Sequence, residues 1–135
     1  MKIFKFWLPP ILWALVIFTF SSFQTASASK FYLGDFLIKK TAHILEYGIF
    51  ASMLYRAMIN SGLGKKKAMW YSVLLAFLYG ATDEFHQSFT PGRGPSIRDV
   101  LIDTFGAGLF VFGLIKNMSK LPKYLKVFAK KIDLA

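Results

Sequence analysis

Three segments of this sequence each place several ionisable or hydroxyl-bearing side chains on one face of a predicted helix. The three faces consist of His43, Glu46 and Tyr47; of Tyr79, Asp83, His86 and Gln87; and of Asp99, Asp103 and Gly106. Each member of a face lies three or four residues from at least one other member, which is the spacing that brings side chains together on a helix surface. Glu84 lies about 100° around the helix from Asp83 and belongs to none of the three faces.

Two histidines among several carboxylates could perform three kinds of chemistry. They could bind a divalent metal through His43 and Glu46, with Asp83 or His86 as the third ligand, although the spacing of His43 and Glu46 is common in proteins. They could transfer protons, because crowded and buried carboxylates hold protons more readily than solvated ones. They could also recognise a phosphate, using Arg93, Arg98 and the N-terminus of the helix that follows. The candidate acid–base groups are Glu46, Asp83, Glu84 and His86.

The composition restricts the classes of protein in which such chemistry could occur. Of 135 residues, 55% are hydrophobic and 18% aromatic, and the mean hydropathy is +0.45. A small soluble domain cannot bury so much apolar surface, so the net charge of +10 does not indicate a nucleic-acid-binding protein. The absence of cysteine excludes disulfides, thiolate zinc sites and a cysteine nucleophile. These features predict a small integral membrane protein with lipids as partners.

Four apolar segments are long enough to cross a bilayer as helices. They cover residues 6–23, 36–59, 68–85 and 97–115, and they are separated by short connections containing Gly, Pro or Ser. Ser96 is the expected N-cap of the last segment. We therefore predict an all-α, polytopic membrane protein with four transmembrane helices in a compact bundle, formed by residues 1–118.

The first apolar segment has a second interpretation. Lys2 and Lys5, the apolar run and the small residues 26–28 resemble a secretory signal peptide. The run is at the long end for a signal peptide, and Pro9 and Pro10 lie near its start, where a retained helix tolerates them. We expect a retained helix.

Residues 119–135 form a basic tail with an amphipathic pattern. Its apolar positions at helical spacing are Leu121, Tyr124, Leu125, Phe128 and Ile132. The lysines on the other face could either hold the helix flat on an anionic inner leaflet or only fix the topology. Pro122 is expected to begin this helix.

The distribution of Lys and Arg predicts the orientation. With both termini in the cytoplasm, most of the 17 basic residues lie on the inner side, and the lysines of the tail account for this excess. The three polar faces then lie at one depth, near the outer surface. A carboxylate that faces lipid costs several kcal/mol, so we expect the faces to turn inward and form a polar chamber beneath the loop that contains Arg93. The alternative is ion pairing that only holds the bundle together, Glu46 with Arg98 or Asp83 with Arg93.

Three blocks of this sequence resemble the motifs of the VanZ-like family. The blocks are residues 39–47 (KKTAHILEY), residues 79–87 (YGATDEFHQ) with Phe89, Pro91, Gly92 and Arg93, and residues 99–103 (DVLID) with Gly106. Trp13 and Ser21-Ser22 suit the family's first helix, and the resemblance extends over residues 6–112. By position, it implies functional roles for His43, Glu46, Tyr47, Asp83, Glu84, His86, Gln87, Arg93, Asp99 and Asp103.

The resemblance implies a four-helix bacterial membrane protein whose biochemical activity is not settled. The family's founding member is associated with low-level resistance to teicoplanin, which binds cell-wall precursors outside the membrane. Our leading hypothesis is a chamber that binds an anionic, lipid-linked envelope component. The alternatives are a metal-assisted or acid–base hydrolase or transferase acting on lipid head groups, and a proton-coupled transporter, which would require dimerisation. Gly106 and Gly108 would permit such a homo-oligomer.

Overall fold

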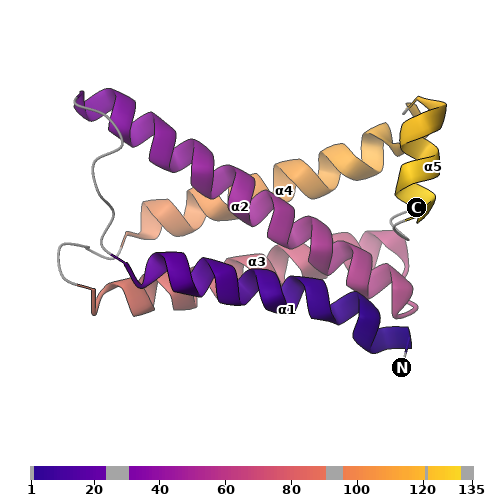
Figure 1. Ribbon diagram of the computed structural model, residues 1–135, viewed down its shortest axis with the longest axis horizontal. Helices are drawn as coiled ribbons and strands as arrows, with labels where there is room; N and C mark the ends of the chain where they lie inside the picture. The colour runs from indigo at the N-terminus through magenta and orange to yellow at the C-terminus, as the bar shows by residue number, and fades with distance from the viewer. Residues whose placement is uncertain (1, 24–30, 91–95, 121, 132–135) are drawn as a thin grey trace.

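The chain forms an antiparallel bundle of four long helices in the computed structural model, which describes residues 2–23, 31–90, 96–120 and 122–131. The elements are α1 (Lys2–Ser21), α2 (Tyr32–Asn60), α3 (Lys65–Gln87), α4 (Ile97–Asn117), the 3-10 turn η1 (Met118–Lys120) and α5 (Lys123–Lys131). Figure 1 shows that successive helices run in opposite directions, so the start of α1 lies at the same end of the bundle as α5. The predicted all-α four-helix bundle is confirmed. α2 and α3 extend beyond both ends of their predicted apolar segments and α4 beyond its C-terminal end, whereas α1 begins four residues earlier than predicted and ends two residues earlier, at Ser21.

The helix boundaries follow local sequence signals. Gly62 has a φ of 95°, in the region that favours glycine, and allows the tight turn between α2 and α3. Ser96 occupies the predicted N-cap position, and its carbonyl accepts the Asp99 N–H at 2.9 Å. Its side chain makes no capping hydrogen bond. Pro122 immediately precedes α5, as predicted.

The prolines of α1 are deeper in the helix than predicted. Because α1 begins at Lys2, Pro9 and Pro10 lie in its third turn and not near its start. Neither residue has an N–H, so the carbonyls of Lys5 and Phe6 lose their usual helical partners. The candidate signal-peptide cleavage sequence, residues 26–28, lies outside the described residues.

The core lies along α2, which packs against the three other long helices. One face of α3 consists of buried small residues, and one of them, Gly80, lies against α2, since a Cβ at this position would be 3.4 Å from the Tyr47 ring. The buried small residues are Ala68, Ser72, Ala76 and Gly80. On α4, the backbone of Gly106 lies against the backbone of Ile44 in α2: a Cβ at Gly106 would be 2.7 Å from the Ile44 carbonyl oxygen. Gly108 has no atom within 4 Å of such a Cβ, so within the described bundle Gly106 mediates a close approach between helices and Gly108 does not.

Large apolar side chains also cover the outside of the bundle. On α4, exposed residues recur at helical spacing and include Leu101, Phe105, Leu109 and Phe112. On α3 they include Trp70, Leu74 and Leu78. Within the described residues, one helix meets the length and composition expected of a membrane span, over Ile3–Ser21. The other long helices carry ionisable residues along part of their length.

Candidate functional site

A cavity of about 620 Å³ lies between the helices in the half of the bundle that contains the end of α1. The part of the lining that comes from α1 is apolar except for Ser21, and consists otherwise of Trp13, Val16, Ile17 and Phe20. The lining from α2, α3 and α4 is mixed: its polar residues are Lys39, Lys40, His43, Glu46, Asp83, Gln87 and Asp99, and its apolar residues are Ala42, Leu45 and Ile49 of α2. The cavity therefore combines apolar surface with charged and polar groups, as a site for an amphiphilic molecule does.

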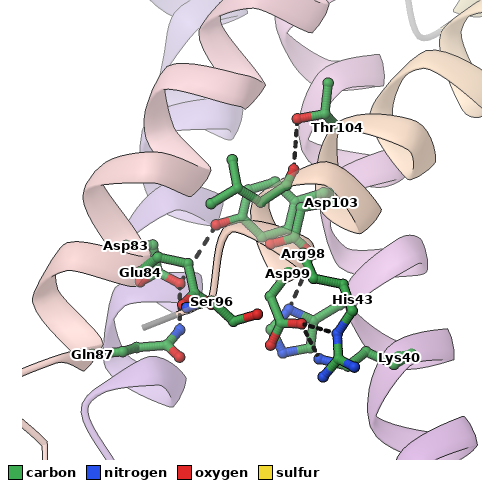
Figure 2. Close-up of polar contacts among 12 residues, drawn as sticks. Lys40, His43, Asp83, Glu84, Gln87, Ser96, Arg98, Asp99, Asp103 and Thr104 are labelled. Atoms are coloured by element: carbon green, nitrogen blue, oxygen red, sulfur yellow. Dashed lines mark hydrogen bonds and ion pairs between the residues drawn. The ribbon is translucent and has the colours of Figure 1, made fainter. Parts of the chain in front are cut away.

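Two polar pairs join α2 to α4 at this site (Figure 2). The Lys40 ammonium lies 2.6 Å from an Asp99 carboxylate oxygen, and His43 Nδ1 lies 3.1 Å from Asp103 Oδ1. Because an ionised carboxylate can only accept, the His43 Nδ1–H is the donor. Asp103 is 2% exposed, whereas His43 lines the cavity. The carboxylate thus lies behind the imidazole and fixes its orientation.

Asp83 connects α3 to this cluster. Its Oδ2 accepts a hydrogen bond from Gln87 Nε2 at 2.8 Å and lies 3.5 Å from the Tyr47 hydroxyl. Its Oδ1 is buried and has no hydrogen-bond partner among the described residues. The expected convergence of the three polar faces is therefore observed through Tyr47 and Asp83 as well as through His43 and Asp103. Whether these residues bind a ligand stays a prediction.

Glu84 and His86 are not among the residues that line the cavity. Glu84 accepts the Ser96 backbone N–H at 2.8 Å, so it links the end of α3 to the start of α4. The His86 ring stacks on Phe18 of α1, with 4.4 Å between the ring centroids. Tyr79 also contacts α1, donating its hydroxyl to the Ala14 carbonyl at 2.6 Å. These side chains hold the bundle around the cavity.

The predicted phosphate-binding arginines do not line the described cavity. The Arg98 side chain is 67% exposed; its Nε lies 3.7 Å from Asp99, and its guanidinium lies over the Phe36 ring. Arg93 lies outside the described residues. The lysines that line the cavity are Lys39 and Lys40, which were not among the predicted site residues. The spacing of Lys40 and His43 could have indicated this position for Lys40, because residues three apart share a helical face.

The proposed metal site is not formed. Among the residues that the structure describes, no three His, Asp or Glu side chains are grouped closely enough to hold a metal ion. The proposed ligands His43, Glu46 and Asp83 are therefore not grouped as a metal site.

By its fold and its cavity, the chain is a small helical-bundle protein with apolar outer faces and a polar, partly ion-paired site between its helices. Comparison with protein families identifies the family to which it belongs. The model of the VanZ/LLP1 family matches residues 6–118, and the chain belongs to this family. The resemblance found in the sequence motifs is thereby confirmed. No curated protein and no solved structure matches the chain.

Proposed function

We propose that the chain is a four-span protein of the bacterial cytoplasmic membrane with both termini in the cytoplasm. Its family membership and the apolar outer faces of α1, α3 and α4 support this arrangement. Contiguous exposed apolar surface of this extent is unusual for a monomeric protein in water but normal for a helix that faces lipid.

The charge distribution supports the same orientation. Every Asp and Glu among the described residues lies in the first half of α2, the last turns of α3 or the first two turns of α4. The opposite end of the bundle, where the chain begins and α5 lies (Figure 1), carries the exposed residues Lys65, Lys66, Lys67, Lys116 and Lys120. The positive end is the cytoplasmic one under the positive-inside rule.

Within this arrangement, we propose that the cavity binds an anionic, lipid-linked component of the cell envelope. The observation that carries this proposal is that one cavity is lined by the apolar residues of α1 and by two lysines of α2. The α1 side would contact the hydrocarbon chain, and the lysines would contact the phosphate. Lys39 is 2.8 Å from Asp35 and Lys40 is 2.6 Å from Asp99, but each ammonium has three donors, so each can also bind a phosphate oxygen. A role in teicoplanin tolerance would follow if that component is a cell-wall precursor.

Replacing both lysines with glutamine, K39Q/K40Q, is expected to reduce retention of anionic lipid by at least about tenfold, because two charge-assisted hydrogen bonds are lost. Native mass spectrometry of the purified protein would measure the retention of phosphatidylglycerol and of a polyprenyl phosphate, with phosphatidylcholine as the neutral reference. Stronger retention of the polyprenyl phosphate would identify a lipid-linked precursor.

Arg98→Gln provides the matched control, because it removes a cation from the same end of the bundle but outside the cavity. It is expected to leave retention unchanged. Equal retention by wild type and K39Q/K40Q, at equal thermal stability, would exclude the cavity as the binding site.

The His43–Asp103 pair favours a second candidate function, acid–base hydrolysis or transfer on a lipid head group. A buried carboxylate that orients a cavity-lining histidine is the arrangement that lets His Nε2 accept a proton from water or a hydroxyl group. The activated oxygen would attack an ester of the head group, and the histidine would return the proton to the leaving oxygen. Asp83 lines the same cavity and could position the nucleophile.

If this second candidate is correct, His43→Gln is expected to abolish any change in head-group composition that the wild-type protein causes when it is expressed in cells. Lipid mass spectrometry would measure the change. His86→Gln is the control, because His86 stacks on Phe18 away from the cavity. Identical lipid profiles with wild type, His43→Gln and empty vector would exclude the enzyme and leave the binding function.

A further inference from the structure

The helix α5 lies outside the residues that the family model matches. In Figure 1 it lies across the end of the bundle and does not continue α4. It has no extensive packing contact with α1, α2, α3 or α4 in the part of the chain that the structure describes. A nine-residue helix is too short to be stable alone in water, so a surface outside the bundle has to stabilise it.

The two sides of α5 differ in character. Tyr124 is 70% exposed and lies on the side that the sequence pattern makes apolar. Lys126 lies about 160° away around the helix, at 100° per residue. Lys123 is exposed and lies about 100° from Tyr124, whereas the exposed Lys131 lies on the Tyr124 side, at the last residue of α5. An exposed aromatic residue on one side, ammonium groups on the other and a lysine at the helix end, from which its long side chain can reach the head groups, are compatible with a helix that lies in a bilayer interface.

The surroundings of α5 determine which surface it fits. The same end of the bundle carries exposed Lys65, Lys66, Lys67 and Lys116, and no carboxylate among the described residues lies there. A protein partner or a second copy would have to supply acidic groups for all these ammonium groups, and this end of a second copy supplies none among those residues. A bilayer that contains anionic lipids supplies both the negative charge and an apolar layer beneath it.

We propose that α5 is an interfacial helix that binds anionic lipid head groups at the cytoplasmic surface of the membrane. The Tyr124 side lies toward the acyl chains, and the lysines contact the phosphates. Each lysine near an anionic surface strengthens such binding about fivefold. This inference rests on the membrane orientation proposed above, but it does not depend on what the cavity binds.

The chain has no cysteine, so one introduced thiol gives one label. The full-length Tyr124→Cys and Lys126→Cys variants would carry a polarity-sensitive fluorophore in nanodiscs of phosphatidylcholine, with or without phosphatidylglycerol. The emission of the Tyr124→Cys label is expected to shift to the blue when phosphatidylglycerol is present, while the Lys126→Cys label does not shift. At 1 M salt the Debye length falls to about 3 Å, so the shift is expected to be lost.

A third label, Leu74→Cys, reports on the exposed apolar face of α3. It is expected to show an apolar environment in both lipid mixtures. If Leu74→Cys is apolar but Tyr124→Cys does not respond to phosphatidylglycerol, the α5 proposal is wrong and the membrane bundle stands. If Leu74→Cys reports water, the membrane proposal itself fails. A Tyr124→Cys shift that appears only when two copies share a nanodisc would assign α5 to self-association instead.

Discussion

Gly106→Ala is expected to lower the free energy of unfolding by about 2 kcal/mol, because a methyl group at this position would meet backbone that cannot move independently. The Cβ would lie 2.7 Å from the carbonyl oxygen and 2.8 Å from the Cα of Ile44. The two helices would have to separate. Since Ile44 follows His43 and Gly106 lies one turn after Asp103, the 3.1 Å contact between His43 and Asp103 would lengthen as well.

Gly108→Ala is the matched control on the same helix. No atom lies within 4 Å of a Cβ at this position, so only the higher helix propensity of alanine applies, and stability is expected to rise by up to about 1 kcal/mol. Thermal unfolding of both variants in one detergent would measure the difference. The two substitutions should therefore change stability in opposite directions, and a shift of the same sign and size in both would contradict the observed packing of α2 against α4.

The four helices could be predicted from the sequence because apolar runs and the Gly and Pro residues between them are local signals. Their ends were less predictable. The apolar run predicts that the second helix begins at residue 36, but α2 begins at Tyr32. Helical hydrogen bonding continues where apolar character stops, and the Asp35–Lys39 ion pair at i and i+4 stabilises that extension.

The faces of the site could also be predicted, but their partners could not. Helical spacing places Asp99 and Asp103 on one side of α4, whereas which helix that side meets depends on the close approach of Gly106 to Ile44. The pairing of Glu46 with Arg98 was one structural alternative. Arg98 precedes Asp99 by one residue and therefore lies about 100° from it, so when Asp99 faces Lys40, the Arg98 side chain turns outward.

The contribution of α1 is the part of the site that sequence spacing could not reveal. The sequence of α1 has no set of polar residues at helical spacing that would mark one face as part of a site. The role of its apolar residues depends on contacts with segments that are distant in the sequence. Trp13 donates its indole N–H to the Glu46 carbonyl at 3.1 Å, and Ala14 accepts from Tyr79. These bonds join residues more than 30 positions apart, and they turn one side of α1 into a cavity wall. A reader of the sequence sees only a hydrophobic helix.

The second large effect is expected at His43. His43→Ala removes the hydrogen-bond donor of Asp103, a carboxylate that is 2% exposed, and should lower the free energy of unfolding by about 3 kcal/mol. Asp103→Asn should cost only about 1 kcal/mol, because an amide oxygen can still accept the His43 Nδ1–H and the imidazole can remain neutral. The two losses of unfolding free energy differ because His43→Ala leaves the buried Asp103 charge without a partner, whereas Asp103→Asn removes that charge.

The double variant His43→Ala/Asp103→Ala separates this explanation from a simple loss of packing. It removes the charge together with its partner, so it should be more stable than His43→Ala alone even though it deletes more atoms. Denaturant or thermal unfolding of the single and double variants under one set of conditions would measure the coupling. The comparison also requires the single variant Asp103→Ala. If the losses of unfolding free energy in His43→Ala and Asp103→Ala add up to the loss in the double variant, the stability of the site comes from packed volume, and the His43–Asp103 contact has no energetic role of its own.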